Sequence, residues 1–401
     1  MNPNNERRIK VMKFLKVILV IFTVMVLTLG MTQVSAAAGK KVVKIGFIGP
    51  LTGPNAAFGL GARNGADLAI KETNKKGKSP YQYELVVMDD GSDPSTGVSV
   101  ATKLITVDKV AAATTHFNSP VGLATIHVFH RYGTPQVFWG GIHPDITYKY
   151  NFFEVTRVCA NTIVEHAQLA DFVVNKMGYK SWSIIYDTTS YGSSSYNSVK
   201  NALGKVGAEI ISADGVPVGT QDFRPILSKI KAAKPGPSVI YFGGVVTEAA
   251  MIKRQMDEMG MTNYLYTGVT GFDSETFNKT AGKAAEGTFI VGKKVIGEDS
   301  PFVQAYNAAG YKEYYEATGP YAYESTNLII AAINKVGPDD KKILAETIRG
   351  IEYRGILGLT KFDKFGQTET GGLTMKVSQN GKWVAWDTSD YSKGGKSLPK
   401  K

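Results

Sequence analysis

The sequence contains one cysteine, five histidines and no complete catalytic motif. With Cys159 alone, an intramolecular disulfide and a cysteine-based zinc site are both excluded. The hydrolase pattern Gly-x-Ser-x-Gly is absent, and a Ser-x-x-Lys match at Ser228 and Lys231 falls in a charged amphipathic segment without partner motifs. We therefore expect no catalytic residue, no cofactor and no enzymatic activity.

The charged residues and the histidines form no obvious cluster. The net charge is +11, but basic residues often stand beside acids, as Lys253 and Arg254 do near Asp257 and Glu258. A mixed solvated surface of this kind does not favour a nucleic-acid partner. A metal site would require convergence of a carboxylate with His116, His127, His130 and His143, and packed or solvated histidines are more common. We expect no metal.

The N-terminus carries a long apolar run. Basic residues in 7–16 precede the uncharged stretch 17–31, and small residues follow from Ser35 to Ala38. This order is typical of a secretory signal peptide, and the stretch is shorter than the about 18–20 residues that a spanning helix needs. We expect residues 1–38 to be a signal peptide, with a retained membrane anchor as the alternative. The mature protein is then periplasmic and does not span the membrane.

The rest of the chain alternates short apolar runs with helical patterns. The runs are apolar on both faces, which indicates buried parallel strands covered by helices. They form two series, 42–48, 83–89, 110–115 and 136–139, followed by 182–187, 208–212, 238–242, 264–267 and 288–292. The sequence thus predicts an α/β fold with two doubly wound, Rossmann-like lobes. The break between the series lies near 155–160, and residues 293–375 are expected to return to the first lobe.

In open parallel sheets, ligands bind beyond the carboxyl ends of the strands. The loops at these positions are rich in glycines, hydroxyls and aromatic rings, which suits holding a molecule rather than transforming it. Ser119, before Pro120 at a predicted helix start, has two readings of equal weight. It either anchors an anion at the helix N-terminus or is an ordinary helix cap. Tyr191 similarly either covers a ligand or fills a turn.

Several of these segments resemble a known family. The run 44–54 (KIGFIGPLTGP), with Phe58-Gly59 and 64–66 (NGA) after it, resembles the start of the leucine/isoleucine/valine-binding proteins of ABC importers. The likeness continues at Asp89-Asp90 and Asp93-Pro94, and again at Tyr191-Gly192, 241–244 (YFGG) and 281–287 (AGKAAEG). In order and spacing it covers about 40–390.

The resemblance implies a type I periplasmic binding fold, in which two lobes joined by three hinge crossings close on a ligand. The crossings would fall near 155–158, 290–293 and 373–377. The lobes would comprise 40–156 with 292–374, and 157–291 with 375–401.

The resemblance also implies that Ser119 and backbone amides hold the ligand's carboxylate, and that Phe58 and Tyr191 line the cleft. We expect the ligand-binding residues to be Phe58, Asn118, Ser119, Gly140, Gly141, Ile142, Tyr191, Val245, Thr270 and Phe272.

The sequence departs from the family at three of these positions. Ile142 and Thr270 stand where the family has the threonine and the glutamate that hold an α-ammonium group, and Val245 replaces a tyrosine. Asp273 and Glu248 are the nearest replacements for the glutamate. The ligand is then a small carboxylate, either an amino acid or, as the departures favour, an apolar or aromatic organic acid.

These features predict a binding protein that acts as a monomer and delivers its ligand to an ABC permease in the cytoplasmic membrane. The alternative is a ligand-sensing protein on the same fold that signals to a receptor. A secreted enzyme would need a nucleophile and a base in the cleft, and none is arranged there in the sequence.

Overall fold

A computed structural model describes residues 7–18 and 39–399 and divides the chain into two units, Met1–Lys41 and Val42–Lys401. In the first unit, residues 7–18 are helical. The other parts of the expected signal peptide, 1–6 and 19–38, lie outside the described residues. Among the described helices, none is both long and apolar enough to cross a membrane.

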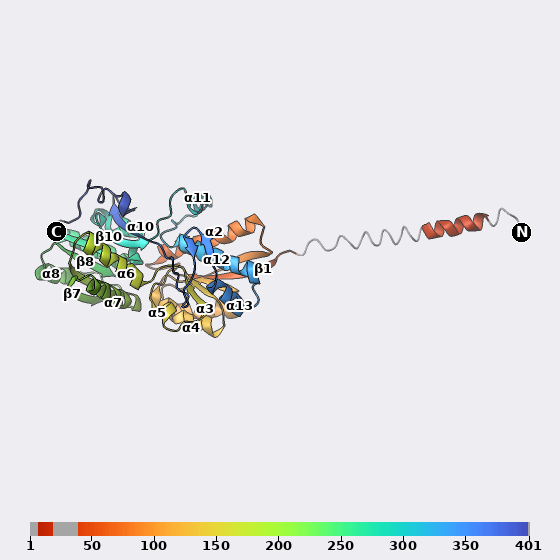
Figure 1. Cartoon of the computed structure of the whole chain (residues 1–401), viewed down its shortest axis with the longest axis horizontal. Coiled ribbons are helices and arrows are strands. Elements are labelled where there is room, and N and C mark those ends of the chain that lie inside the picture. The colour runs from red at the N-terminus through yellow and green to blue at the C-terminus, as the bar shows by residue number, and fades with distance from the viewer. Residues whose placement is uncertain (1–6, 19–38, 400–401) are drawn as a thin grey trace. The chain divides into compact units, whose positions relative to one another are not determined.

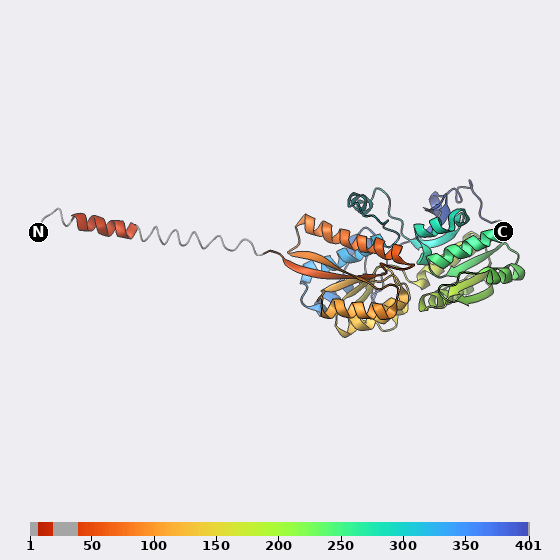
Figure 2. The same cartoon turned by 180° about the vertical axis from the view of Figure 1, so that it is seen from behind.

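The second unit contains two large sheets, which gather at opposite ends of it (Figures 1 and 2). In the part of the chain described, the first sheet has five strands in the order β2-β1-β3-β4-β5, and β1, β3, β4 and β5 run parallel. These strands are β1 (Lys41–Gly49), β2 (Tyr81–Asp89), β3 (Ala112–Thr115), β4 (Gln136–Phe138) and β5 (Val155–Arg157).

The second sheet has seven described strands in the order β14-β13-β10-β9-β8-β6-β7. Strands β6 to β10 are parallel, whereas β13 and β14 add an antiparallel edge. The strands are β6 (Ser181–Asp187), β7 (Glu209–Val216), β8 (Ser238–Gly243), β9 (Tyr264–Gly268), β10 (Phe289–Lys293), β13 (Leu373–Gln379) and β14 (Lys382–Ala385). A separate two-stranded sheet joins β11 (Tyr353–Gly355) to β12 (Gly358–Thr360).

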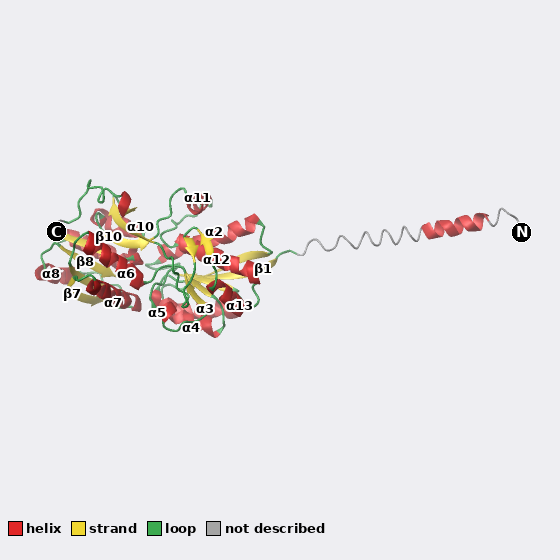
Figure 3. Ribbon diagram, in the orientation of Figure 1, coloured by secondary structure: helices red, strands yellow, loops and turns green. Residues whose placement is uncertain are grey.

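Helices cover both faces of the first sheet (Figure 3). Alternate residues of β1 point to opposite faces: Ile45 and Phe47 pack under α2 and α12, and Ile48 packs under α3 and α4. The helices nearest this sheet are α2 (Ala56–Lys76), α3 (Pro94–Thr106), α4 (Ser119–Arg131), α5 (Asp145–Tyr148), α11 (Pro301–Ala308), α12 (Gly319–Val336) and α13 (Lys341–Arg349). The segment after residue 293 therefore supplies helices to the first sheet.

The second sheet is buried in the same way. Ile240 and Phe242 of β8 pack against α8, α9 and α10, and Val239 and Tyr241 pack against α6, its π-helical extension and α7. These helices are α6 (Thr162–Ala170) with the extension η1 (Asp171–Lys176), α7 (Ser190–Lys205), α8 (Arg224–Ala233), α9 (Val246–Glu258) and α10 (Glu275–Ala281); single turns form η2 (Thr270–Phe272), η3 (Gly282–Ala285) and η4 (Trp386–Thr388). The apolar runs in the interior of both sheets are thus buried strands, whereas β2 and β7 lie at sheet edges and stay partly exposed.

Two glycines let α2 approach the segment that leads into α12. A Cβ on Gly61 would lie 2.5 Å from the carbonyl oxygen of Tyr315, and one on Gly65 would lie 2.2 Å from that of Gly319. These distances leave no room for a side chain. Within α2, which begins at Ala56, these two glycines therefore serve close packing.

Gly65→Ala should lower the free energy of unfolding by about 1–3 kcal/mol, because the new methyl group must displace backbone. The matched control is Gly204→Ala in α7, where an added Cβ would meet nothing within 4 Å. That change should stabilise the protein by up to about 1 kcal/mol. Urea unfolding midpoints measure both, and an unchanged midpoint for Gly65→Ala would contradict the packing account.

Candidate functional site

A cavity of about 270 Å³ opens among the strand ends of both sheets. Its wall comes from the loops that follow β1 to β4 of the first sheet, and from the ends or following loops of β6 to β10 in the second. This is the position expected for a ligand site in parallel sheets, here supplied from two sides. The wall consists of Asn55, Ser92, Phe117, Asn118, Ser119, Pro120, Gly140, Gly141, Ile142, Asp187, Thr189, Tyr191, Val218, Val245, Thr270, Gly271 and Lys293.

Ser119 lies at the first turn of α4 but does not cap that helix. The N-cap residue is Asn118, whose side chain makes no capping hydrogen bond. The Ser119 hydroxyl instead accepts a hydrogen bond from the backbone N–H of His143 at 3.2 Å. The capping interpretation of Ser119 is therefore wrong. Its hydroxyl lies in the cavity wall beside the positive end of the helix dipole.

The loop after β4 brings backbone close to the cavity. Gly141 has a φ of 52°, and a Cβ on Gly140 would lie 2.6 Å from the carbonyl oxygen of His116. Behind this loop, the fully buried guanidinium of Arg157 donates to the carbonyl oxygens of Gly141 at 2.8 Å and His143 at 2.7 Å. The Arg157 guanidinium thus holds the loop from the side away from the cavity. Burial lowers the pKa of this guanidinium.

The aromatic part of the wall differs from expectation. Phe58 and Phe272 are buried but do not line the cavity, so their predicted place in the cleft is corrected. Phe58 lies behind Phe117, with ring centroids 4.2 Å apart, and Phe117 faces the cavity in its place. Phe272 packs on Tyr266 inside the second lobe's core, because its helical turn points inward. The other eight predicted residues all lie in the wall.

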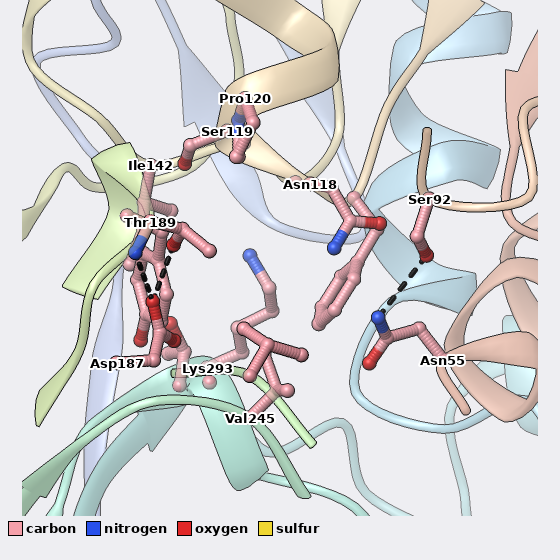
Figure 4. Close-up of a pocket in the computed structure, with 17 residues that line it drawn as sticks. Asn55, Ser92, Asn118, Ser119, Pro120, Ile142, Asp187, Thr189, Val245 and Lys293 are labelled. Carbon is pink, nitrogen blue, oxygen red and sulfur yellow. Dashed lines mark hydrogen bonds between the residues drawn. The ribbon is translucent and has the colours of Figure 1, made fainter. Parts of the chain in front are cut away.

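Tyr191 and Asp187 form the wall on the side of α7. The Tyr191 hydroxyl is buried and, among the described residues, has no hydrogen-bond partner. Asp187 Oδ1 accepts from the backbone N–H of Thr189 at 2.9 Å and from its hydroxyl (Figure 4). Burial raises the pKa of Asp187. A ligand in the cavity can therefore meet the Asp187 carboxylate on this side of the wall.

A buried carboxyl group lies behind Thr270. The Thr270 hydroxyl donates to both oxygens of Glu165, at 2.8 and 3.0 Å. Burial raises the pKa of Glu165 to about 8, although nearby Lys293 and the bonds from Thr270 act to lower it. Glu165 is therefore largely protonated and neutral at pH 7. His166 beside it is also neutral, because burial lowers its pKa to about 4.

The two acids considered as replacements for the family's glutamate do not reach the cavity. Asp273 forms a buried ion pair with Lys376, with both N–O distances 2.8 Å. Glu248 accepts from the backbone N–H of Gly219 at 2.9 Å. Neither lies in the wall, so neither is placed to meet an ammonium group there.

The histidines are used in separate protein contacts. His116 lies between Asp90 and Thr125, with distances of 3.1 and 2.8 Å, and His130 contacts Glu154 at 3.0 Å. Across residues 7–18 and 39–399, no three His, Cys, Asp or Glu side chains are grouped to hold a metal ion.

Lys293 and Asp187 are the charged wall residues that the sequence reasoning missed. Asp187 ends β6 and Lys293 ends β10, so each lies just before the loop in which ligand contacts are expected. The signal available in the sequence was a charged residue at the end of an otherwise apolar strand, next to a loop expected to contact the ligand. Lys293 was hidden because it follows the last residue of the predicted run 288–292.

Glu165→Gln should remove a pH dependence of stability. The pKa of the Glu165 carboxyl group is higher in the folded state than in the unfolded chain. The contribution of this group to the free energy of unfolding is therefore full below about pH 4.5 and is lost as the pH rises towards about 8. The variant should therefore gain stability relative to the parent between about pH 5 and pH 8, by up to several kcal/mol. Urea unfolding across this range measures the difference.

The control is Glu84→Gln, which removes an exposed carboxyl group that forms no ion pair among the described residues. A constant difference between Glu165→Gln and the parent across the pH range would show that Glu165 is ionised in the folded protein.

Comparison with known proteins gives a consistent result. Residues 42–382 match the model of a family described as periplasmic binding protein. An amino acid binding protein of Pseudomonas aeruginosa is 29% identical over 357 residues, covering 88% of this chain and 91% of that protein.

Two solved structures are also similar. The leucine binding protein LivK of Thermotoga maritima has a TM-score of 0.78 and 26% identity, covering 86% of this chain and 97% of its own. A solute binding protein of R. palustris in complex with benzoate has a TM-score of 0.77 at 20% identity, covering 86% and 95%, a likeness of fold alone. The predicted α/β fold and family resemblance are confirmed, and the chain belongs to the periplasmic binding protein family.

Proposed function

We propose that this chain is the solute-binding component of an ABC importer and binds a small carboxylate ligand in the cavity. The observation that carries the proposal is the origin of the wall: strand ends of both sheets contribute to one cavity of about 270 Å³. A ligand there contacts both halves of the protein at once. Binding and closure are then the same event, as expected for a protein that captures and releases cargo.

We place the lobe boundaries and hinges where the chain passes between the sheets. The first crossing follows Arg157 at the end of β5, the second follows Lys293 at the end of β10, and the third precedes Leu373 at the start of β13. These positions support lobes of 40–156 with 292–374 and of 157–291 with 375–401. We further propose that the mature chain is a periplasmic monomer that docks on a membrane permease.

The chemistry of the wall supports a carboxylate. Ser119 and the first turn of α4 supply a hydroxyl and the positive end of a helix dipole, which together favour an anion. The relatives agree with this class: one is described as an amino acid binding protein, and another was solved with benzoate. Among the described wall residues there is no histidine and no cysteine, and no serine hydroxyl is hydrogen-bonded to a carboxylate, so binding without turnover is the function we propose.

Ser119→Ala should weaken ligand binding about 10- to 100-fold, because a hydrogen bond to a charged group contributes about 1.5–3 kcal/mol. Isothermal titration with leucine, phenylalanine and benzoate provides the measurement. The change also leaves the backbone N–H of His143 without its acceptor, so the free energy of unfolding should fall by about 1 kcal/mol.

Ser300→Ala is the matched control, because Ser300 does cap a helix and lies outside the cavity. It should cost about 1 kcal/mol of stability and leave affinity unchanged. The proposal fails if no carboxylate in the panel binds, or if Ser119→Ala binds as tightly as the parent.

A further inference from the structure

We propose that Lys293 determines ligand specificity: its ammonium group pairs with an anionic group of the ligand and disfavours any ligand that carries an α-ammonium. The cargo is then a carboxylate without an amino group. This inference rests on the proposed function and narrows its ligand class.

Lys293 is placed to meet a ligand. It is the last residue of β10, its side chain is buried, and it points into the cavity between Asn118 on one side and Thr189 on the other (Figure 4). Its ammonium nitrogen donates to the carbonyl oxygen of Trp139 at 3.4 Å and lies 4.3 Å from the ring centroid of Tyr321. Both partners are neutral, so neither balances the charge.

The nearby carboxyl groups do not balance it either. In the part of the chain that the structure describes, Lys293 forms no ion pair within 4 Å. Glu165 is protonated in its buried site, and Asp273, which accepts from the backbone N–H of Lys293 at 2.8 Å, is paired with Lys376. The Lys293 charge thus has room for an anion that the protein does not supply.

A second buried cation adds to this bias. Arg157 lies behind the loop 140–143 and, besides the Gly141 and His143 carbonyls, donates to Gln367 and Thr147, all neutral acceptors. Asp187 is the one carboxylate in the described wall. Lys293 lines the cavity while Arg157 lies behind its wall, so the two buried cations outnumber this wall carboxylate, and a ligand with a single negative charge would reduce the imbalance. A zwitterion brings its own cation and leaves the imbalance unchanged.

Lys293 also links the two halves of the protein, since Trp139 follows β4 while Lys293 belongs to β10. A purely structural role would make its loss weaken the binding of every ligand to the same extent. A role in specificity would change the ratio between ligands that differ only in their amino group. Ligand pairs with matched carbon skeletons separate the two.

The test is isothermal titration of the purified protein with 4-methylpentanoate against leucine, and with 3-phenylpropanoate against phenylalanine. In the parent protein, the acid without the amino group should bind at least about 10-fold more tightly than its amino acid in at least one pair. Lys293→Met should weaken binding of that acid about 10- to 100-fold and bring the ratio of the pair close to one. Lys293→Arg, which keeps the charge, should keep the preference.

Lys294→Met is the control: it removes the neighbouring lysine, whose ammonium donates to the Leu357 carbonyl outside the cavity, and should leave the ratio unchanged.

If Lys293→Met does not fold, the parent ratios and Lys293→Arg still decide the question. Tighter or equal binding of the amino acids overturns this inference but leaves carboxylate binding intact. Equal weakening of both members of a pair by Lys293→Met shows a structural role. Binding of none of the four compounds removes the proposed function itself.

Discussion

The buried guanidinium of Arg157 joins three segments on which the cavity depends. Nη1 holds the carbonyls of Gly141 and His143, and Nε donates at 2.7 Å to Gln367, whose backbone lies beside β5. These carbonyl groups take the place of water around the buried cation. Moving any of them would leave the charge poorly solvated, so their positions are fixed. The N–H of His143, which meets Ser119, is fixed as a consequence. A group remote from solvent thereby sets the geometry of the surface that a ligand would touch.

Burial has opposite effects on the ionisable groups around this site. Glu165 keeps its proton because an isolated carboxylate there would be costly, whereas Asp273 forms a buried ion pair with Lys376. With Glu165 neutral and Asp273 paired, the wall residue Lys293 has no carboxylate within ion-pair distance among the described residues. Groups behind the wall thereby affect the charge that a ligand would meet.

Much of this could be predicted from the sequence. Apolar runs separated by helical patterns predict both sheets, and the rule that ligands bind at the carboxyl ends of strands identifies most of the loops around the cavity. The errors came from details that depend on packing. Asn118 rather than Ser119 occupies the N-cap position, and Phe117 rather than Phe58 faces the cavity, because each depends on the direction of one backbone turn.

The raised pKa of Glu165 and the neutral surroundings of Lys293 could not be predicted for a different reason. They arise from contacts between residues far apart in the sequence, such as Glu165 with Thr270 and Lys293 with Trp139. Composition shows that a lysine is present but not whether a carboxylate lies beside it. Charge balance in an interior is a property of the assembled fold.

The contact of α2 with α12 has a consequence for how the chain matures. The first sheet is made of residues 41–157, yet one of its faces is covered by α12, Gly319–Val336, packed against Gly61 and Gly65. Until that late segment has emerged, this face of the early strands is covered by α2 alone, and the N-terminal half cannot complete its core as an independent unit. The core of the first half is thus closed by residues from the last third of the described chain, so this half is completed late in synthesis.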